Sequence, residues 1–189
     1  MAKIVSPMKN IVWIFFSLLS LSACAPQQRT LLPQVLLLSP ASLGRSVYAQ
    51  QQLEAEFNGQ SWQMQGALEV TPQGLRMVGL TPFGQRLITL LWDGQKLQEE
   101  RAAQLPQTVQ GERILSDVQL MYWPLPALRE VLPAGWRVEQ EGGVRHVRDA
   151  ERELIKITCT TPDPWQGRCV FDHLVYGYRL TLDSQLDTP

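Results

Sequence analysis

Alternation of apolar and polar residues over residues 47–101 limits this part of the chain to a β-sheet. In the first segment, residues 47–57, the apolar side chains share one parity, and polar side chains fill most of the other positions. The apolar positions are Val47, Ala49, Leu53, Ala55 and Phe57. A period of two gives a strand one buried and one wet face. Asn58-Gly59 follows, a pair that tolerates the positive φ angles of a type I′ turn, so the pattern predicts a hairpin.

The alternation continues beyond this turn. Four further strands are predicted, at 61–70, 75–80, 85–92 and 95–101. Thr71-Pro72-Gln73-Gly74, Thr81-Pro82-Phe83-Gly84 and Asp93-Gly94 separate them, and Gly, Pro and Asp are typical turn residues. Residues 47–101 are therefore expected to form an antiparallel meander.

The middle of the chain has helical spacing instead. Residues 112–122 place Ile114, Leu115, Val118, Met121 and Tyr122 on one stripe. A second short helix is expected at 126–132, with Leu125, Leu128, Val131 and Leu132 facing inward. Strands are then predicted at 136–140, 144–148, 153–159, 169–173 and 177–182, with a frayed tail over 183–189. Strands, helices and strands in this order predict an α+β fold with one curved antiparallel sheet of about ten strands, covered by the helices.

The N-terminus has the features of a bacterial lipoprotein. Residues 1–23 contain an apolar run, Ile11–Ala23, that is shorter than the ~20 residues of a membrane-spanning helix, so a cleaved signal peptide is favoured over a retained anchor. Leu21-Ser22-Ala23-Cys24 matches the lipobox, which makes Cys24 the expected acylation site; an ordinary signal peptide that contains a cysteine is the alternative. Ala25 after the cysteine favours the periplasmic face of a Gram-negative outer membrane. Translation can start at Met1 or Met8.

The expected domain boundaries follow from this interpretation. Residues 24–44 are predicted to form the acylated cysteine and a tether, with a docked segment that begins at Leu36-Leu37-Leu38. Residues 45–183 are expected to form the domain, and 184–189 the tail. After residue 23 the chain keeps all 18 acidic and 15 of its 17 basic residues, a formal charge of −3. It has no basic block, which argues against a nucleic-acid partner.

Cys159 and Cys169 flank a loop rich in turn formers. Two strands that leave this loop would place the cysteines opposite each other, and an oxidising periplasm would allow a disulfide. Two free, half-buried thiols are the alternative. A metal pair is less favoured, because only His173 lies nearby as a further ligand.

The sequence has no pattern of an active site. His146 is expected on the polar face with no acid at pairing distance, and His173 follows Asp172 in a short strand. Neither has the neighbours that a general base or a zinc site requires, and no nucleophile elbow, metalloprotease motif or P-loop occurs. Glu99-Glu100 and the Glu151/Glu153 pair are typical of solvated strand ends. We therefore expect no enzymatic activity, no cofactor and no metal.

A curved sheet with a helical lid can enclose an apolar cavity that binds acyl chains by burial alone. The expected lining residues are Trp62, Met64, Leu68, Met77, Leu87, Leu91, Leu115, Val118, Met121, Leu125 and Leu128. The alternative is a core that these side chains fill completely.

Two stretches resemble the LolB family of outer-membrane lipoprotein receptors. Arg76–Gly84 is similar to the strand and Pro-apolar-Gly loop of that family, and Trp123–Pro133 to its proline-bounded lid helix. The element order also agrees over about residues 45–182. The chain looks closer still to an uncharacterised LolB-like lipoprotein family, some members of which accompany aryl-polyene or fatty-acid-type biosynthesis genes.

The resemblance implies an open half-barrel covered by two or three short helices. It also implies a loop, Pro82-Phe83-Gly84, that inserts cargo into the membrane, and a LolA-like periplasmic carrier as partner. A Phe83 side chain folded back onto the core is the alternative. The cysteine loop and the Thr-Pro-Phe-Gly form of the turn depart from LolB.

Two functions are therefore expected as alternatives. The first is a lipoprotein that binds acyl chains or lipidated cargo and delivers it to the outer membrane. The second is a non-transporting structural or assembly lipoprotein with a filled core.

Overall fold

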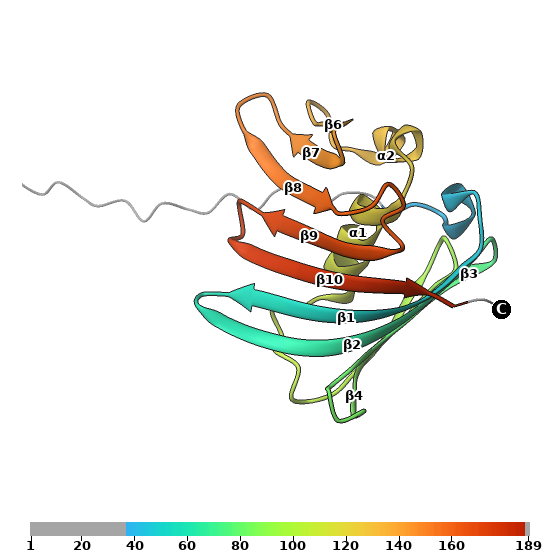
Figure 1. Cartoon of the computed structure of the whole chain (residues 1–189). Helices are drawn as coiled ribbons and strands as arrows, with labels where there is room; N and C mark the ends of the chain where they lie inside the picture. The colour runs from blue at the N-terminus through green and yellow to red at the C-terminus, as the bar shows by residue number, and fades with distance from the viewer. Residues whose placement is uncertain (1–36, 188–189) are drawn as a thin grey trace, which may run out of the picture. The chain divides into compact units, whose positions relative to one another are not determined.

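The computed structural model describes residues 37–187 and contains one ten-stranded sheet (Figure 1). Its strands are β1 (Val47–Phe57), β2 (Gln60–Thr71), β3 (Gly74–Leu80), β4 (Arg86–Trp92), β5 (Leu97–Arg101), β6 (Arg137–Glu141), β7 (Val144–Arg148), β8 (Glu153–Cys159), β9 (Gly167–His173) and β10 (Tyr178–Leu186). Its helices are the 3₁₀ turn η1 (Pro40–Leu43), α1 (Gly111–Tyr122) and α2 (Leu125–Val131). The expected signal peptide, its alternative starts and Cys24 lie outside the described residues.

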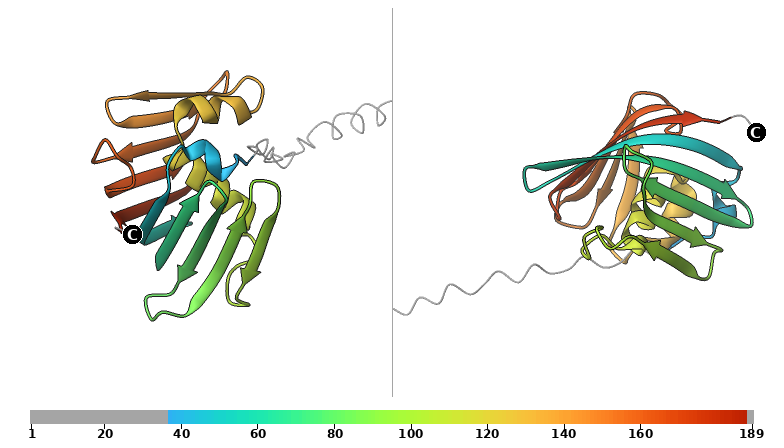
Figure 2. Two further views of the ribbon diagram at one scale, coloured as in Figure 1. Left: turned by 90° about the vertical axis from the view of Figure 1, so that its right-hand side faces the viewer. Right: turned by 90° about the horizontal axis from the view of Figure 1, so that it is seen from below.

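The strand order explains why the helices cross the sheet. The order is β5-β4-β3-β2-β1-β10-β9-β8-β7-β6, with every neighbouring pair antiparallel. The chain thus leaves the sheet at one edge, β5, and re-enters it at the other edge, β6. Helices α1 and α2 make this connection on the concave side of the curved sheet (Figure 2). The predicted fold class, an open, curved antiparallel sheet covered by short helices, is confirmed.

The β1–β2 hairpin has the predicted turn and register. Asn58 and Gly59 both have positive φ, 51° and 73°, as a type I′ turn requires. The strands pair from Val47↔Val70 to Phe57↔Gln60, which puts the apolar residues of both strands on one face. Near the tether end that face is fully buried, with Val47 3% and Val70 0% exposed.

The core lies between this face and the helices. The largest side chains that are almost completely buried come from both layers and from the loop between β8 and β9: Trp123, Leu115, Leu120 and Leu128 from the helical connection, Leu75, Leu90, Leu154, Ile157 and Phe171 from the strands, and Trp165 from the loop. Helix α1 is buried on nearly all sides because the sheet curves around it. This burial supplies most of the stability, at roughly 25 cal/mol for each Å² of apolar surface.

The segment before β1 belongs to the folded domain. Leu38 and Leu43 are buried, and the Leu38 backbone N–H donates to Gln119 Oε1 over 2.8 Å. The Leu38 carbonyl accepts hydrogen bonds from Gln119 Nε2 and Trp92 Nε1. A docked segment, as the sequence predicts from Leu36 onward, is thus present at Leu38–Leu43.

The predicted frayed tail from residue 183 is wrong as far as Leu186. Strand β10 continues to Leu186 and pairs with β1 up to Ala49↔Leu186. Ser184 is buried and accepts a hydrogen bond from Gln51 Nε2. The extension was missed because Ser184, a polar residue, interrupts the apolar positions Leu180, Leu182 and Leu186 of an otherwise alternating strand.

Candidate functional site

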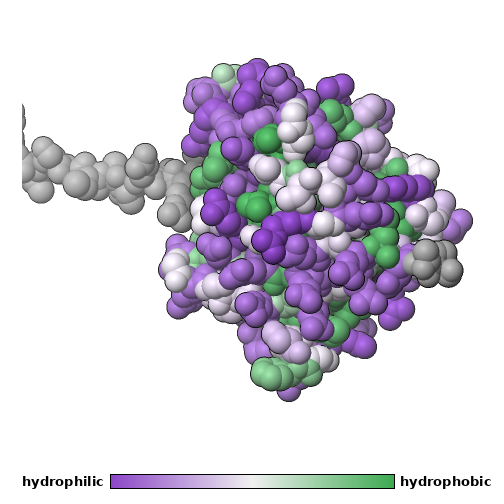
Figure 3. All heavy atoms as spheres, viewed as in Figure 1, coloured by the Kyte–Doolittle hydropathy of each residue, from purple (hydrophilic) through white to green (hydrophobic). Residues whose placement is uncertain are grey.

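The turn between β3 and β4 presents Phe83 to solvent. Phe83 is 93% exposed, the highest value among the large apolar side chains that the structure describes as exposed. The turn lies at the bottom of Figure 1, where Figure 3 shows a hydrophobic tip on an otherwise mainly hydrophilic face. Phe83 therefore does not fold back onto the core.

Hydrogen bonds within the turn hold Phe83 outward. The Gly84 N–H donates to the Thr81 carbonyl over 2.9 Å, and the Thr81 N–H donates to the Gln85 carbonyl over 2.8 Å. The Gln85 N–H also donates to the Thr81 hydroxyl. Gly84 has a φ of 80°, a conformation that L-residues rarely adopt. The turn is thus ordered by its own backbone, and Phe83 contributes nothing to that order.

Most of the predicted lining residues lie on the concave side. Leu68, Leu115, Val118, Met121 and Leu128 are buried in the core, and Met64, Met77 and Leu125 are partly buried. Trp62 is on the same face of β2 but is 44% exposed, because it lies near the β1–β2 turn, where the sheet is less covered.

Two predicted lining residues, Leu87 and Leu91, are not buried on the concave side. Leu90 and Trp92 have the inward parity in β4, so Leu91 points to the opposite face and is 39% exposed. Leu87 lies at a β-bulge, where the partner of β3 shifts from Ile88 to Arg86, and it is only partly buried. The inward-facing positions could not be predicted here, because the run Leu87–Trp92 is apolar at nearly every position and therefore shows no alternation.

A cavity of about 270 Å³ opens where α1 passes into α2. Its walls come from η1, from Arg45 just before β1, from the α1–α2 junction, from strands β6 to β8 with the turn between β6 and β7, and from the loop between β8 and β9. The lining residues are Leu43, Arg45, Met121, Tyr122, Trp123, Pro124, Gln140, Gly143, Arg145, Ile157, Cys159, Thr161, Pro162, Pro164 and Trp165. Only Met121 among them was predicted to line a cavity. A second, more open hollow of about 430 Å³ lies beside the β1–β2 and β9–β10 turns.

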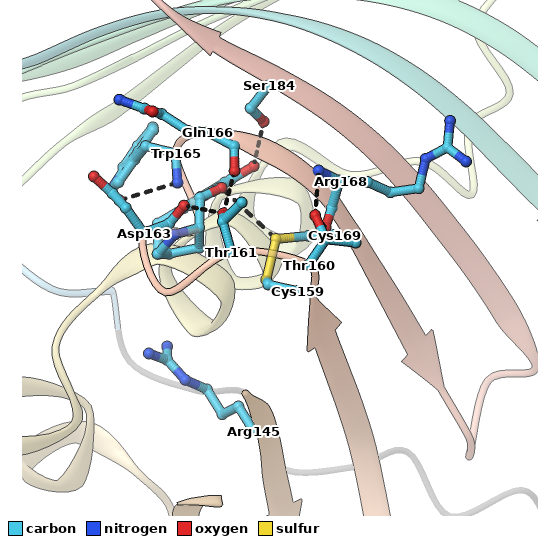
Figure 4. The surroundings of a disulfide bond; sticks show 12 residues. Arg145, Cys159, Thr160, Thr161, Asp163, Trp165, Gln166, Arg168, Cys169 and Ser184 are labelled. Carbon is cyan, nitrogen blue, oxygen red and sulfur yellow. Dashed lines mark hydrogen bonds between the residues drawn. A yellow bond between two sulfur atoms is a disulfide. The ribbon is translucent and has the colours of Figure 1, made fainter. Parts of the chain in front are cut away.

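The structure joins Cys159 and Cys169 across β8 and β9 (Figure 4). The bonded loop is further ordered by Thr161, whose hydroxyl contacts the carbonyls of Asp163 and Gln166. Trp165 at the loop tip is 1% exposed and stacks on Tyr122 with 4.0 Å between ring centroids. The disulfide loop thus forms a fixed wall of the cavity.

Loss of this disulfide should destabilise the fold. Closing a loop of ten residues removes denatured-state entropy worth about 2–3 kcal/mol, so the Cys159→Ala/Cys169→Ala variant should unfold at correspondingly lower urea concentration. Urea titration with and without reductant measures this. The double variant should not respond to reductant, whereas the wild type should. Equal midpoints for the oxidised wild type and the variant would contradict the expectation.

A buried polar cluster lies where α1 meets β9 and β10. The Tyr178 hydroxyl donates to Asp117 Oδ2 over 2.6 Å, and the Arg113 guanidinium stands 4.2 Å from the Tyr176 ring centre. Burial raises the pKa of Asp117 to about 7, although the Tyr178 hydrogen bond and Arg113 both oppose this. Burial and the charge of Arg113 lower the pKa of His173 to about 4. Both groups are therefore mainly neutral in the folded protein at mildly acidic pH.

The prediction that His146 has no nearby acid is wrong. Its Nδ1 contacts Glu153 Oε1, because β7 and β8 pair side by side and the short turn between them brings Glu153 back beside His146. The pair is partly exposed and lies outside both hollows. Glu99 also differs from a solvated strand end, since it accepts the Gly111 N–H at the start of α1.

Arg145 is the residue that the sequence did not single out. It lies on the same side of β7 as buried Val147, opposite Ile157, and is 9% exposed. In the segment Val144–Arg148 valines occupy both parities, so alternation could not tell which arginine points inward. The one available signal was that Arg145 shares its parity with Val147.

Two further findings concern metals and membranes. Within residues 37–187, no group of three or more His, Cys, Asp or Glu side chains is arranged to hold a metal ion. No helix in that range combines the length and hydropathy that crossing a membrane requires.

Comparison with other proteins places this chain in a family. No curated protein matches it. The sequence pattern of one family matches residues 48–186, which is well over half of the chain and spans the sheet from the start of β1 to the end of β10. The chain belongs to this family, which is described as a protein of unknown function (DUF3261).

Proposed function

We propose that this protein is a LolB-like outer-membrane lipoprotein, which binds acyl chains or lipidated cargo on the concave side of its sheet and helps to deliver it to the membrane. The observation that carries the proposal is Phe83, a 93% exposed aromatic side chain on a turn ordered by its own hydrogen bonds. An exposed apolar side chain on a rigid turn costs solubility and gains nothing for the fold. Insertion into a bilayer would bury the Phe83 side chain and so explain why it is exposed in the free protein.

The concave face supports cargo binding. Its half-covered end carries partly exposed apolar side chains, including Phe57 at 40% and Trp62 at 44%. An acyl chain that covered such surface would gain roughly 25 cal/mol for each Å² buried, without any reactive group. In this proposal Cys24 carries the acyl anchor, a LolA-like carrier hands over the cargo, and no enzymatic step takes place.

Replacement of Phe83 by Glu tests the membrane step. Burial of a Phe side chain gains about 1.5–3 kcal/mol, so in the chain without its acyl anchor (Cys24→Ser) Phe83→Glu should reduce vesicle affinity by at least tenfold. It should leave the unfolding midpoint unchanged, because the side chain contacts solvent. Flotation with liposomes and transfer of a fluorescent fatty acid to them are the measurements.

Two further variants serve as controls for that experiment. Phe83→Leu keeps an apolar group at the tip and should retain most of the affinity. Leu91→Glu places the same charge on another exposed apolar position, on the outer face of β4, and should leave vesicle affinity and fatty-acid transfer largely intact. Equal vesicle binding by the wild type and Phe83→Glu would overturn the proposed membrane role.

A second function is favoured by the packing at the centre of the concave side. Leu115, Trp123 and Leu128 have no solvent contact, so this part of the interior is filled by the protein itself. A structural or assembly lipoprotein needs only such a filled interior and no ligand cavity. The absence of saturable binding of a fluorescent fatty acid, together with a stable cross-linked protein partner, would favour this function over cargo delivery.

A further inference from the structure

The cavity at the α1–α2 junction carries positive charge, and its other lining residues are mostly apolar, with polar groups from Gln140, Gly143 and Thr161. Two of its fifteen lining residues are charged, and both are arginines, Arg45 and Arg145. Among the described residues, no Asp or Glu lines it. Most of the remaining walls are aromatic, aliphatic, thioether or proline side chains: Leu43, Met121, Tyr122, Trp123, Pro124, Ile157, Pro162, Pro164 and Trp165.

The two arginines differ in how their charge is balanced. Arg45 donates from Nη2 to both carboxylate oxygens of Asp163, over 2.8 and 3.0 Å. Arg145 takes part in no ion pair with any residue that the structure describes. Arg145 is also the more buried of the two, at 9% exposed. The excess positive charge of the cavity therefore belongs to Arg145.

The contacts of Arg145 orient the guanidinium without neutralising it. Nη1 donates to the carbonyls of Leu120 and Trp123 over 2.6 and 2.9 Å, at the C-terminal end of α1. Nε and Nη2 donate to Gln140 Oε1 over 3.4 and 3.2 Å. These acceptors are all uncharged. One Nη2 N–H has no acceptor among the described residues, and burial lowers the pKa of Arg145 to about 10.

A buried charge without a counter-charge is costly, which makes an anion the natural complement of this cavity. Figure 4 shows the Arg145 side chain on one side of a space. The disulfide loop, with Asp163 and Trp165, lies on the other side. The volume of about 270 Å³ is near the lower limit of ~300–1,000 Å³ for small-molecule sites. It suits an anionic group with a short apolar body.

We propose that this cavity is a binding site for a small anionic amphiphile, whose carboxylate or phosphate pairs with Arg145 and whose apolar part lies against Tyr122, Trp165 and the neighbouring prolines. This goes beyond acyl-chain binding on the concave face, which needs no charge. It also does not require Phe83 or a membrane.

Ligands that share the same apolar chain but differ in charge test how much the charge and the apolar body each contribute to binding. The full chain would be titrated with decanoate, decyl phosphate, decanol and inorganic phosphate by calorimetry. We expect decanoate or decyl phosphate to bind at least about tenfold more tightly than decanol, as a charge-assisted hydrogen bond to arginine predicts. Inorganic phosphate that bound as tightly as decyl phosphate would identify a free anion as the ligand and overturn the role of the apolar body.

Substitutions test which arginine produces the preference for an anionic ligand. Arg145→Gln should reduce the decanoate-to-decanol affinity ratio to about one, and Arg145→Lys should retain part of it. Arg148→Gln removes another arginine of β7, which pairs with Glu139 and Glu153 and does not line the cavity, and should leave the ratio unchanged. Loss of the ratio in Arg148→Gln but not in Arg145→Gln would overturn the assignment.

A readout on the wild type covers the case in which Arg145→Gln does not fold, because Arg145 also holds the end of α1. Decanoate should shift the Nε–Hε resonance of Arg145 in ¹⁵N-labelled protein, and decanol should not. Equal binding of decanoate and decanol, or binding of neither, would overturn the proposal. Phe83→Glu should keep the decanoate preference, so the failure of this site and the failure of membrane delivery give different results.

Discussion

Replacement of Asp117 by Asn is expected to make the protein more stable than the wild type at pH 8, by up to about 4 kcal/mol, with most of this difference gone by about pH 4. Asp117 is 8% exposed, and burial raises its pKa to about 7 from a usual value of 3.8. The folded protein therefore binds a proton there that the unfolded chain has lost between these values. This contribution to stability is complete below pH 3.8 and is lost as the pH rises through 7.

The size of the effect follows from about 1.4 kcal/mol for each pKa unit. Asparagine cannot ionise, and its side-chain oxygen can still accept the Tyr178 hydroxyl that Asp117 accepts over 2.6 Å. Urea unfolding between about pH 4 and 8 measures the difference. Asp183→Asn is the control, because that carboxylate is 48% exposed and pairs with Arg168 at the surface.

His173 should produce the opposite trend in acid. Its pKa is lowered to about 4, so the unfolded chain binds a proton between pH 6.5 and 4 that the folded protein does not bind. Stability from this group is lost as the pH falls through that range. In the wild type the two trends oppose each other. In Asp117→Asn only the loss in acid should remain, and parallel pH profiles for variant and wild type would contradict this account.

Replacement of Trp123 by Ala is expected to cost about 3–5 kcal/mol, the usual range for a fully buried tryptophan. Trp123 has no solvent contact, and its Nε1 donates to the Ser42 hydroxyl over 2.9 Å. The change would open a void at the end of α1 and release η1 from the helix. Denaturant unfolding followed by circular dichroism measures the loss.

Trp62→Ala is the matched control for this prediction. It removes the same side chain from the concave side at a position that is 44% exposed, and should cost roughly 1 kcal/mol. Equal losses for the two variants would contradict the difference in packing between the filled centre and the open end of the concave side.

The sheet could be predicted from the sequence because most strands have one wet face. Alternation and turn residues predicted the bounds of every strand in residues 47–101 to within two residues, and the bounds of both helices to within one. Prediction failed where local pattern and tertiary position diverge. Leu91 is apolar yet lies on the outer face, and Ser184 is polar yet buried by its hydrogen bonds in a central strand.

The candidate site was predictable only in part. Phe83 was identified through the resemblance of its loop to that of LolB, whereas the sequence left open whether its side chain points outward or folds back onto the core. Arg145 was not identified, because its burial depends on which side of β7 faces α1 and on carbonyls at the end of a helix 22 or more positions away in sequence. Long-range contacts of this kind leave no local signal.

The most direct test of the proposed function is to measure whether residue 83 inserts into a bilayer. Phe83→Trp places a fluorophore at the tip of the turn, in a background in which the partly exposed Trp62 is replaced by Phe to reduce other signals that respond to vesicles. On addition of anionic phospholipid vesicles, we expect the emission of the introduced indole to shift to the blue and to be quenched by lipids brominated on their acyl chains. Emission that stays unshifted and unquenched while the protein is bound to the vesicles would contradict a membrane-inserting role for this turn.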